Sequence, residues 1–271
     1  MSVDPLVMAT AVEAVLAAGA VQLAHFGRAL RIDKKGPIDL VTNADLEAER
    51  AVERLVAERF PGDAVLAEEG GGERSAPARR CWILDPLDGT TNFAHGLPIF
   101  SASLAVEEDG ELVYGAVYDP SRRELFTAER GAGAFLNGAP IRVSPTAALV
   151  DAVLATGFPY DVHSTRDEIV GLFAEFVGRV RAVRRLGSAS LDLCYVAAGR
   201  FDGFWEKRLK PWDMAAGALI VQEAGGTVTH WDGTRFRPRR DDLVAAGPGL
   251  HEELRRIIDE YESRRLANGT P

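Results

Sequence analysis

The chain has 271 residues, of which 46% are hydrophobic and 26% are charged. This composition is typical of a globular protein with a substantial core, as one large domain or two halves, and excludes a disordered chain. The formal net charge of −9 disfavours direct binding to nucleic acid or to an anionic membrane surface. A phosphate ester is also an anion, so an acidic enzyme acting on one must gather cations locally.

The first apolar segment, residues 14–27, contains no Asp, Glu, Lys or Arg. It is too short to span a bilayer, and no basic stretch precedes it, which argues against a signal sequence. Apolar residues between Val7 and Val21 recur every three or four positions, as on the buried face of a helix. We therefore expect a core helix of a cytoplasmic protein without a membrane segment.

A turn at residues 34–37 leads into the segment 39–42, and a second helix follows from about Asn43. Pro61-Gly62-Asp63 ends this helix. Two short apolar runs, 64–67 and 81–84, then stop at acidic residues, so we expect strands that present carboxylates at their C-terminal ends. The apolar face of the second helix comprises Ala48, Val52, Leu55, Val56 and Phe60.

The remaining chain shows two patterns. Residues 99–143 are β-rich, with a hairpin turn at Asn137-Gly138, whereas strands alternate with helices from about residue 150. We expect an α+β half over residues 1–145 and an α/β half over residues 146–271. The predicted strands are 100–106, 112–118, 124–128, 134–143, 153–156, 203–205, 227–230 and 243–246, and the predicted helices lie near 165–179, 188–199, 212–224 and 249–266.

The cysteines and histidines argue against two kinds of site. Cys81 and Cys194 are far apart and lack CxxC spacing, so we expect buried reduced thiols. The five histidines form no zinc-like pair. Neither a disulfide nor a zinc site is therefore expected.

The most informative local sequence is WILDPLDGTTNF, residues 82–93. A buried strand is predicted to end at Asp85, Pro86 fixes the backbone, and Asp88 follows three residues later. In such a tight turn both carboxylates and the Leu87 carbonyl can converge on one cation, and hard divalent ions such as Mg²⁺ prefer oxygen ligands. Gly89 permits a close backbone approach, and the threonines after it can open a helix whose free N–H groups face a phosphate.

Each acidic residue also has an ordinary structural explanation. Asp85 and Asp88 can be solvated side chains of a turn, and the pair Glu68-Glu69 can lie on the surface. Asp45 and Asp213 can be helix caps. The individual patterns are weak, and only their combination points to a function.

The combination resembles the inositol monophosphatase family, within the lithium-sensitive Mg²⁺-dependent phosphatase superfamily. The resemblance runs from Asp39 to about Gly226, with the motif AEEG at 67–70 followed in order by two signature stretches, 82–93 and 212–226. It implies a layered αβαβα sandwich with the site in a cleft between the two halves. It also implies a homodimer that hydrolyses inositol monophosphate or a similar small polyol or sugar phosphate.

The resemblance assigns roles to individual residues. Thr90 and Asp45 match the pair that orients the attacking water, with Glu68 as a further catalytic residue. Two Mg²⁺ ions are implied, and family members can hold a third, weaker one. The implied metal ligands are Glu68, Asp85, the Leu87 carbonyl, Asp88 and Asp213. The implied substrate-binding residues are Asp88, Gly89, Thr90 and Thr91 for the phosphate, Gly187, Ser188, Ala189 and Glu206 for the polyol, and Lys34 on a mobile loop that approaches the site.

These residues suit direct attack by water without a phosphoenzyme. Two Mg²⁺ ions about 3.5–4 Å apart lower the pKa of a bound water and stabilise the leaving alkoxide. Thr90 can relay the proton of the water if Asp45 holds its hydroxyl. By analogy with the family, Li⁺ is expected to inhibit.

The substrate and two rival functions stay open. Thr91-Asn92-Phe93 looks like the inositol monophosphate branch, since the branches acting on adenosine bisphosphate or histidinol phosphate tend to carry Lys after DGT. Lys207 and Arg208 depart from the family pattern. They are solvated surface charges, or they bind a second anionic group, as in fructose 1,6-bisphosphate or a nucleotide. One rival function is that of a non-catalytic partner of RNA or transcription machinery. The other is a Ca²⁺-stabilised binding module, whose function Ca²⁺ would support, whereas Ca²⁺ would inhibit the enzyme.

Overall fold

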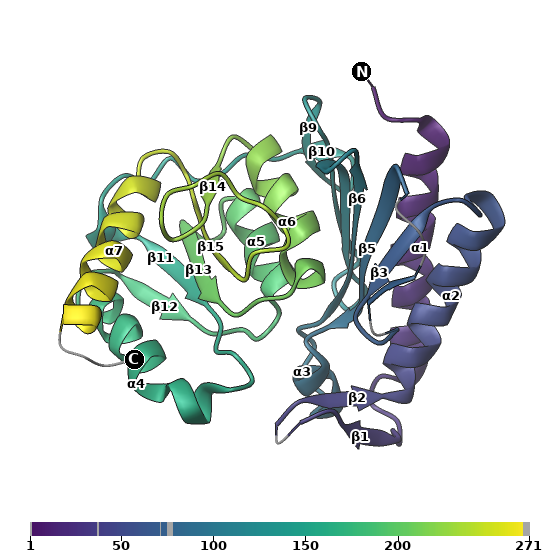
Figure 1. Ribbon diagram of the computed structural model, residues 1–271, viewed down its shortest axis with the longest axis horizontal. Helices are drawn as coiled ribbons and strands as arrows, with labels where there is room; N and C mark the ends of the chain where they lie inside the picture. The colour runs from purple at the N-terminus through teal and green to yellow at the C-terminus, as the bar shows by residue number, and fades with distance from the viewer. Residues whose placement is uncertain (1, 37, 71, 75–77, 268–271) are drawn as a thin grey trace.

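The computed structural model describes residues 2–36, 38–70, 72–74 and 78–267. Two large β-sheets alternate with layers of helices (Figure 1). One helical layer lies between the sheets, and the other two cover their outer faces. The layered αβαβα sandwich implied by the resemblance is therefore confirmed.

The first large sheet has eight strands in the order β10-β9-β8-β7-β6-β5-β3-β4. Only the pair β3–β5 is parallel; the other neighbours are antiparallel. The predicted hairpin at Asn137-Gly138 is confirmed, and both residues have the positive φ that such turns require, but its second strand ends at Pro140 rather than at residue 143. The strands are β3 (Ala64–Ala67), β4 (Gly72–Arg74), β5 (Arg80–Asp88), β6 (Ser101–Glu108), β7 (Glu111–Asp119), β8 (Glu124–Glu129), β9 (Gly133–Leu136) and β10 (Ala139–Pro140).

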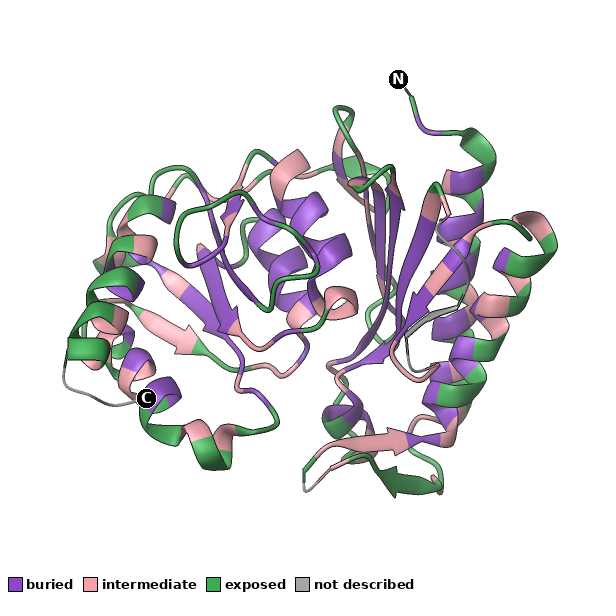
Figure 2. Cartoon of the chain, viewed as in Figure 1, coloured by how far each residue is buried: buried purple, intermediate pink, exposed green. Residues whose placement is uncertain are grey.

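Helices cover both faces of this sheet, which explains why β5 is apolar on both sides. Trp82 and Leu84 pack in the core beneath α1 and α2, whereas Ile83 belongs to the core shared with α5 and α6. The outer helices are buried on the side that faces the sheet and exposed on the other (Figure 2). The outer face of this sheet is covered by α1 (Pro5–His25) and α2 (Asn43–Arg59), and the face toward the second sheet by α5 (Ala189–Ala197) and α6 (Pro211–Glu223).

The second large sheet has five strands in the order β12-β11-β13-β15-β14. β11 is parallel to both neighbours, and β15 is antiparallel to both of its neighbours. In β13, Phe204 faces the central core with α5 and α6, whereas Trp205 faces the outer core with α4 and α7. These elements are β11 (Val153–Thr156), β12 (Ala182–Arg184), β13 (Gly203–Lys207), β14 (Thr227–Thr229), β15 (Asp242–Ala246), α4 (Val162–Val177) and α7 (His251–Ala267).

The first helix is longer than the uncharged stretch suggested. By length and composition alone α1 qualifies as a membrane span, so the expectation that this segment is too short was wrong for the complete helix. One face of α1, including Val7, Ala11 and Ala18, is nevertheless fully buried in the core beneath the first sheet. That packing is the one predicted from the periodicity.

Several short elements connect the layers. β1 (Ile32–Lys34) and β2 (Leu40–Thr42) form a separate two-stranded antiparallel sheet at the predicted turn, within which Pro37 lies outside the described residues. The other two are α3 (Thr90–Ala94) and a 3₁₀ turn at Leu149–Asp151. The division into halves at residue 145 stays a prediction. The two halves are in direct contact, because α6 of the second half packs on β6 and β7 of the first.

Candidate active site

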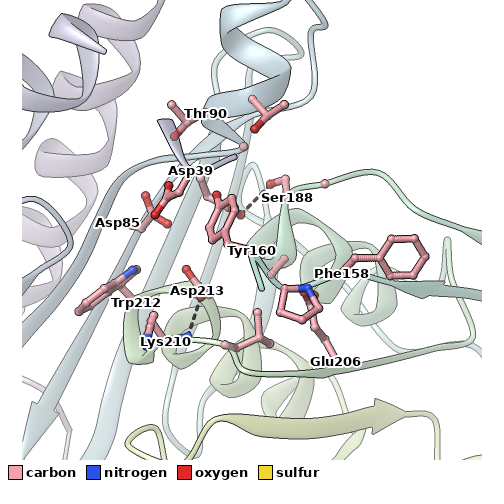
Figure 3. A pocket seen from close by; sticks show the side chains of 18 of the residues that line it. Asp39, Asp85, Thr90, Phe158, Tyr160, Ser188, Glu206, Lys210, Trp212 and Asp213 are labelled. Carbon is pink, nitrogen blue, oxygen red and sulfur yellow. Dashed lines mark hydrogen bonds between the residues drawn. The ribbon is translucent and has the colours of Figure 1, made fainter. Parts of the chain in front are cut away.

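One pocket is lined by four of the acidic residues that the sequence singled out, whereas Asp45 and Glu69 are not among its lining residues. Glu68 follows β3, Asp85 and Asp88 belong to β5, and Asp213 lies in the first turn of α6. Figure 3 shows Asp85 and Asp213 directed toward the same space. The expected convergence of residues from separate segments is therefore present, although their role as metal ligands stays a prediction.

The pocket lies at the carboxyl ends of parallel strands from both sheets. β3 and β5 are parallel in the first sheet, and β11, β12 and β13 are parallel in the second. The residues that follow these strands, or end them, line the pocket. Open α/β sheets commonly bind ligands at this edge.

β5 does not end at Asp85, as the sequence predicted, but continues through Pro86 to Asp88. Its register with β6 shifts between Asp85 and Asp88, and an irregularity of this kind tolerates proline. The buried Gln22 amide of α1 donates hydrogen bonds to the carbonyls of Pro86 (2.8 Å) and Ser101 (3.1 Å). The consecutive residues Leu87 and Asp88 both line the pocket, although the Leu87 side chain is fully buried in a core cluster with Phe93 and Phe100.

Main-chain hydrogen bonds orient two of the carboxyl groups. The N–H of Leu87 donates to Asp85 Oδ1 (2.9 Å), and the N–H of Lys210 donates to Asp213 Oδ2 (2.7 Å). Among the described residues, no hydrogen bond occupies the second oxygen of either carboxyl group. Both are therefore oriented with one oxygen available to a cation.

Asp88 is held by the start of α5. Its Oδ2 accepts hydrogen bonds from Ser188 Oγ (2.7 Å), Ser190 Oγ (2.5 Å) and the N–H of Ser190 (2.8 Å). Ser190 Oγ also lies 2.7 Å from Ser101 Oγ. Ser188 was predicted as a substrate-binding residue, whereas Ser190 was not predicted. Its signal in the sequence was its place in the first turn of a helix, where free N–H groups attract carboxylates.

The four carboxyl groups are close enough to affect one another. Burial raises the pKa of Asp85, and the charges of Glu68, Asp88 and Asp213 raise it further. Burial also raises the pKa of Asp213. For Glu68, burial raises the pKa to about 7, although the charge of Lys35 lowers it. Buried carboxyl groups that repel one another ionise readily only beside a cation.

This donor set fits a hard divalent cation. It consists of carboxylates and one backbone carbonyl, with no thiolate or imidazole among the residues that line the pocket, and such oxygen donors are those that Mg²⁺ prefers. Within the described ranges, no three His, Cys, Asp or Glu side chains already surround a common point. Metal binding therefore requires side-chain adjustment.

Lys35, not Lys34, is the hairpin lysine of the pocket. The resemblance implied Lys34, but Lys34 is exposed and does not appear in the pocket lining. Lys35 Nζ lies 2.7 Å from Glu68 Oε1 and 2.8 Å from Glu69 Oε1. Neighbouring residues of an extended chain point in opposite directions, so two consecutive lysines cannot be distinguished without knowing the orientation of the hairpin.

Thr90 and Asp45 form the expected pair. Thr90 Oγ1 lies 3.0 Å from Asp45 Oδ1 and also 3.0 Å from the Leu87 carbonyl, and its single hydrogen can serve either acceptor. Asp45 Oδ2 accepts the N–H and hydroxyl of Thr42, at 2.8 and 2.5 Å, in a capping box at the start of α2. Asp45 is therefore both a helix cap, as its ordinary explanation held, and the partner of Thr90.

The predicted polyol-binding residues also line the pocket. Glu206 at the end of β13 lines it together with Gly187, Ser188 and Ala189. Burial raises the pKa of Glu206 to about 8, although Arg185 opposes the shift. Within the described part of the chain the Glu206 carboxyl group has no hydrogen bond, so it is available to a donor on a ligand.

The sequence missed other residues of the pocket. Asp192 of α5 is buried, and its Oδ1 has no hydrogen-bond partner among the described residues. Phe158 and Tyr160 come from the loop after β11, and Tyr160 stands near Asp85 in Figure 3. No sequence motif marked these three positions.

Lys207 and Arg208 are ion-paired rather than solvated. Lys207 Nζ lies 2.7 Å from Glu168 Oε1 and above the ring of Trp231. Arg208 lines the pocket, but its guanidinium lies 2.8 Å from Glu168 and 3.4 Å from Asp161. The interpretation as solvated surface charges was therefore wrong, because these residues attach the end of β13 to α4.

Comparisons with known proteins agree with the fold. The model of the inositol monophosphatase family matches residues 5–263. The inositol-1-monophosphatase of Rhizobium meliloti is 44% identical over 249 residues, which cover 91% of this chain and 94% of that protein. The Nus factor SuhB of Vibrio cholerae is 45% identical, with 88% of this chain and 89% of that protein covered. The structure of inositol monophosphatase from Anabaena is 38% identical and superposes with a TM-score of 0.86, covering 94% and 96% of the two chains.

Proposed function

Because the chain belongs to the inositol monophosphatase family, we propose that it is a Mg²⁺-dependent phosphatase acting on inositol monophosphate or a similar small polyol or sugar phosphate. The observation that carries the proposal is the pocket shared by Glu68, Asp85 and Asp213, which come from three separate segments. A buried carboxylate cluster repels a phosphate ester unless cations are bound first. The carboxylate cluster can therefore serve a phosphate-ester substrate only as a set of metal ligands.

Glu68, Asp85, Asp88, Asp213 and the Leu87 carbonyl would hold the Mg²⁺ ions. Bound Mg²⁺ supplies the positive charge that a phosphate dianion needs and lowers the pKa of a water molecule. The hydrogen bonds that Leu87 and Lys210 donate to Asp85 and Asp213 keep these carboxyl groups oriented before the ion arrives. Such supporting hydrogen bonds commonly tune metal affinity.

Thr90 and Asp45 would position the attacking water. When the Thr90 hydroxyl donates to Asp45, 3.0 Å away, its lone pairs are free to accept a hydrogen bond from that water. The capping box with Thr42 fixes the acceptor. A base held in this way raises the rate only when it lies within hydrogen-bond reach of the proton it takes.

Glu206 would accept a hydrogen bond from a hydroxyl group of the substrate. The pocket encloses about 270 Å³, near the lower end of the range for small-ligand sites. A small phosphorylated polyol matches this volume and the acidic group of Glu206. Arg208 is already ion-paired, so it is not available to a second anionic group of a substrate.

A phosphate-release screen tests the proposal. Inositol 1-phosphate, fructose 1,6-bisphosphate, histidinol phosphate and adenosine bisphosphate are compared with Mg²⁺, with Ca²⁺, and with Mg²⁺ plus Li⁺. We expect Mg²⁺-dependent release, greatest from inositol 1-phosphate, with inhibition by Ca²⁺ and Li⁺ and none in Asp213→Asn. Release that persists in a chelator, or in Asp213→Asn, would refute the proposal.

A second candidate function is a non-catalytic role with transcription machinery. It is favoured by the similarity to proteins named Nus factor SuhB, such as the one from Vibrio cholerae. A chromosomal Asp213→Asn variant separates the two functions in the cell. A growth defect equal to that of a deletion supports the enzyme, whereas wild-type growth, with a defect only on deletion, supports the second role. The cytoplasmic location and the homodimer stay predictions.

A further inference from the structure

Lys35 links the β1–β2 hairpin to the acidic end of β3. Its Nζ contacts one oxygen of Glu68 and one of Glu69, at 2.7 and 2.8 Å. The Lys35 side chain is 27% exposed, whereas those of Glu68 and Glu69 are 16% and 5% exposed, so the carboxyl groups are more shielded from water than the lysine. The main-chain N–H of Lys35 donates to the Asp39 carbonyl (3.0 Å), which fixes the base of the side chain within the hairpin.

Lys35 holds a special position among the cations of the pocket. Arg185, Arg208 and Lys210 also line it. Among the described residues, however, only Lys35 forms an ion pair with one of the four proposed metal-binding carboxylates. It therefore neutralises part of a negative cluster that otherwise has no counter-ion.

An ammonium group and a metal ion on Glu68 oppose each other. The ammonium nitrogen lies 2.7 Å from Glu68 Oε1, which leaves Oε2 to a cation, and Mg²⁺ binds oxygen at about 2.1 Å. Two cations sharing one carboxylate repel each other at short range. The charge of Lys35 at Glu68 therefore works against binding of the ion.

We propose that Lys35 is an internal counter-ion of the carboxylate cluster, which stabilises the cluster by its ion pair with Glu68 and opposes the binding of Mg²⁺ there. This inference rests on the proposed function in one respect, because it takes Glu68 as a metal ligand. Its consequence is that Lys35 weakens the affinity for Mg²⁺. The hairpin thereby sets the Mg²⁺ concentration at which the site fills.

Calorimetric titration of Mg²⁺ into metal-free protein tests the inference without any turnover measurement. Lys35→Met removes the competing charge, and Arg31→Met is the matched control, because Arg31 is a hairpin cation paired with Asp33 and 81% exposed. We expect Lys35→Met to bind Mg²⁺ about tenfold more tightly than wild type, as follows from losing a hydrogen bond between charged groups. Arg31→Met should stay within about twofold of wild type, since exposed ion pairs contribute little.

Thermal unfolding provides a second measurement. Without metal, Lys35→Met should unfold at a lower temperature than wild type, and saturating Mg²⁺ should raise its Tm by more than it raises that of wild type. Lys35→Arg keeps the charge and should resemble wild type in both measurements. If Lys35→Met does not fold without metal, Lys35→Gln, which still donates a hydrogen bond, takes its place.

The outcomes separate the two levels of interpretation. Equal or weaker Mg²⁺ binding by Lys35→Met, relative to wild type and Arg31→Met, overturns the counter-ion role and leaves the proposed function standing. Absence of Mg²⁺ binding by the wild-type protein overturns the proposed function itself.

Discussion

A methyl group on Gly157 and the carboxyl group of Glu206 cannot occupy the same place. A Cβ on Gly157 would lie 2.0 Å from Glu206 Oε2, well inside van der Waals contact. The two residues follow directly on the paired positions Thr156 and Trp205 of β11 and β13. The absence of a side chain at Gly157 therefore determines where the Glu206 carboxyl group lies in the pocket.

Gly157→Ala should impair substrate binding more than folding. The obstructed atoms are at the end of the Glu206 side chain, so the carboxyl group can move aside and lose the substrate hydroxyl. We expect KM to rise about tenfold, the loss of one hydrogen bond to a charged group, with little change in Tm. Steady-state kinetics check this, with Gly178→Ala as the control, because a Cβ there meets nothing within 4 Å. An unchanged KM, or a further loss when Gly157→Ala is combined with Glu206→Ala, would contradict it.

Glu206 should also make stability depend on pH. Burial raises its pKa from the usual 4.5 to about 8 in the folded protein. The unfolded chain therefore releases the proton first, and Glu206 disfavours the folded state increasingly as pH rises from about 4.5 to about 8. In a chelator, the Tm of Glu206→Gln relative to wild type should be higher at pH 9 than at pH 6. A difference that does not change with pH would mean that Glu206 is not desolvated.

Thr90→Val should separate chemistry from metal binding. Valine keeps the shape of the buried side chain but removes the hydroxyl that lies 3.0 Å from Asp45 Oδ1. Loss of general-base catalysis typically costs about 10²–10⁴-fold in rate, so kcat should fall by at least about hundredfold. The Mg²⁺ affinity, measured by calorimetry, should fall by no more than about tenfold, because Thr90 is not among the proposed ligands and contacts only one of them, the Leu87 carbonyl. A large loss of Mg²⁺ affinity would instead make Thr90 part of the metal site.

Ser190→Ala tests the support of Asp88. The substitution removes the 2.5 Å hydrogen bond to Asp88 Oδ2 but keeps the main-chain N–H that donates to the same oxygen. Residues that orient metal ligands typically affect affinity or activity by about 10–100-fold, and we expect Mg²⁺ affinity to fall within this range. Ser164→Ala, on the exposed side of α4, is the matched control. Equal affinities in the two variants would contradict a supporting role for Ser190.

The sequence predicted elements whose signals are local. Helix α2 begins at Asn43 because Thr42 and Asp45 form a capping box there, and β11 covers the predicted residues 153–156. The αβαβα arrangement and the site residues came from the resemblance, not from periodicity. Local signals thus located the elements but did not arrange them.

The errors have a common physical cause, since they depend on contacts between distant segments. Pro86 reads as the end of a strand, yet β5 continues because Gln22 of α1 satisfies its carbonyl. Ser190 gains its role from Asp88, 102 residues away. Lys35 was missed because the choice between two lysines depends on how the hairpin lies against Glu69. Such relationships require tertiary packing.

The most direct test of the metal site is a crystal soaked with Mn²⁺, whose position anomalous diffraction reveals. We expect at least one anomalous peak within about 2.5 Å of carboxylate oxygens of Glu68, Asp85 or Asp213, a distance suited to a hard divalent ion. A soaked crystal without a peak in this pocket, or with Mn²⁺ bound only elsewhere, would contradict the account.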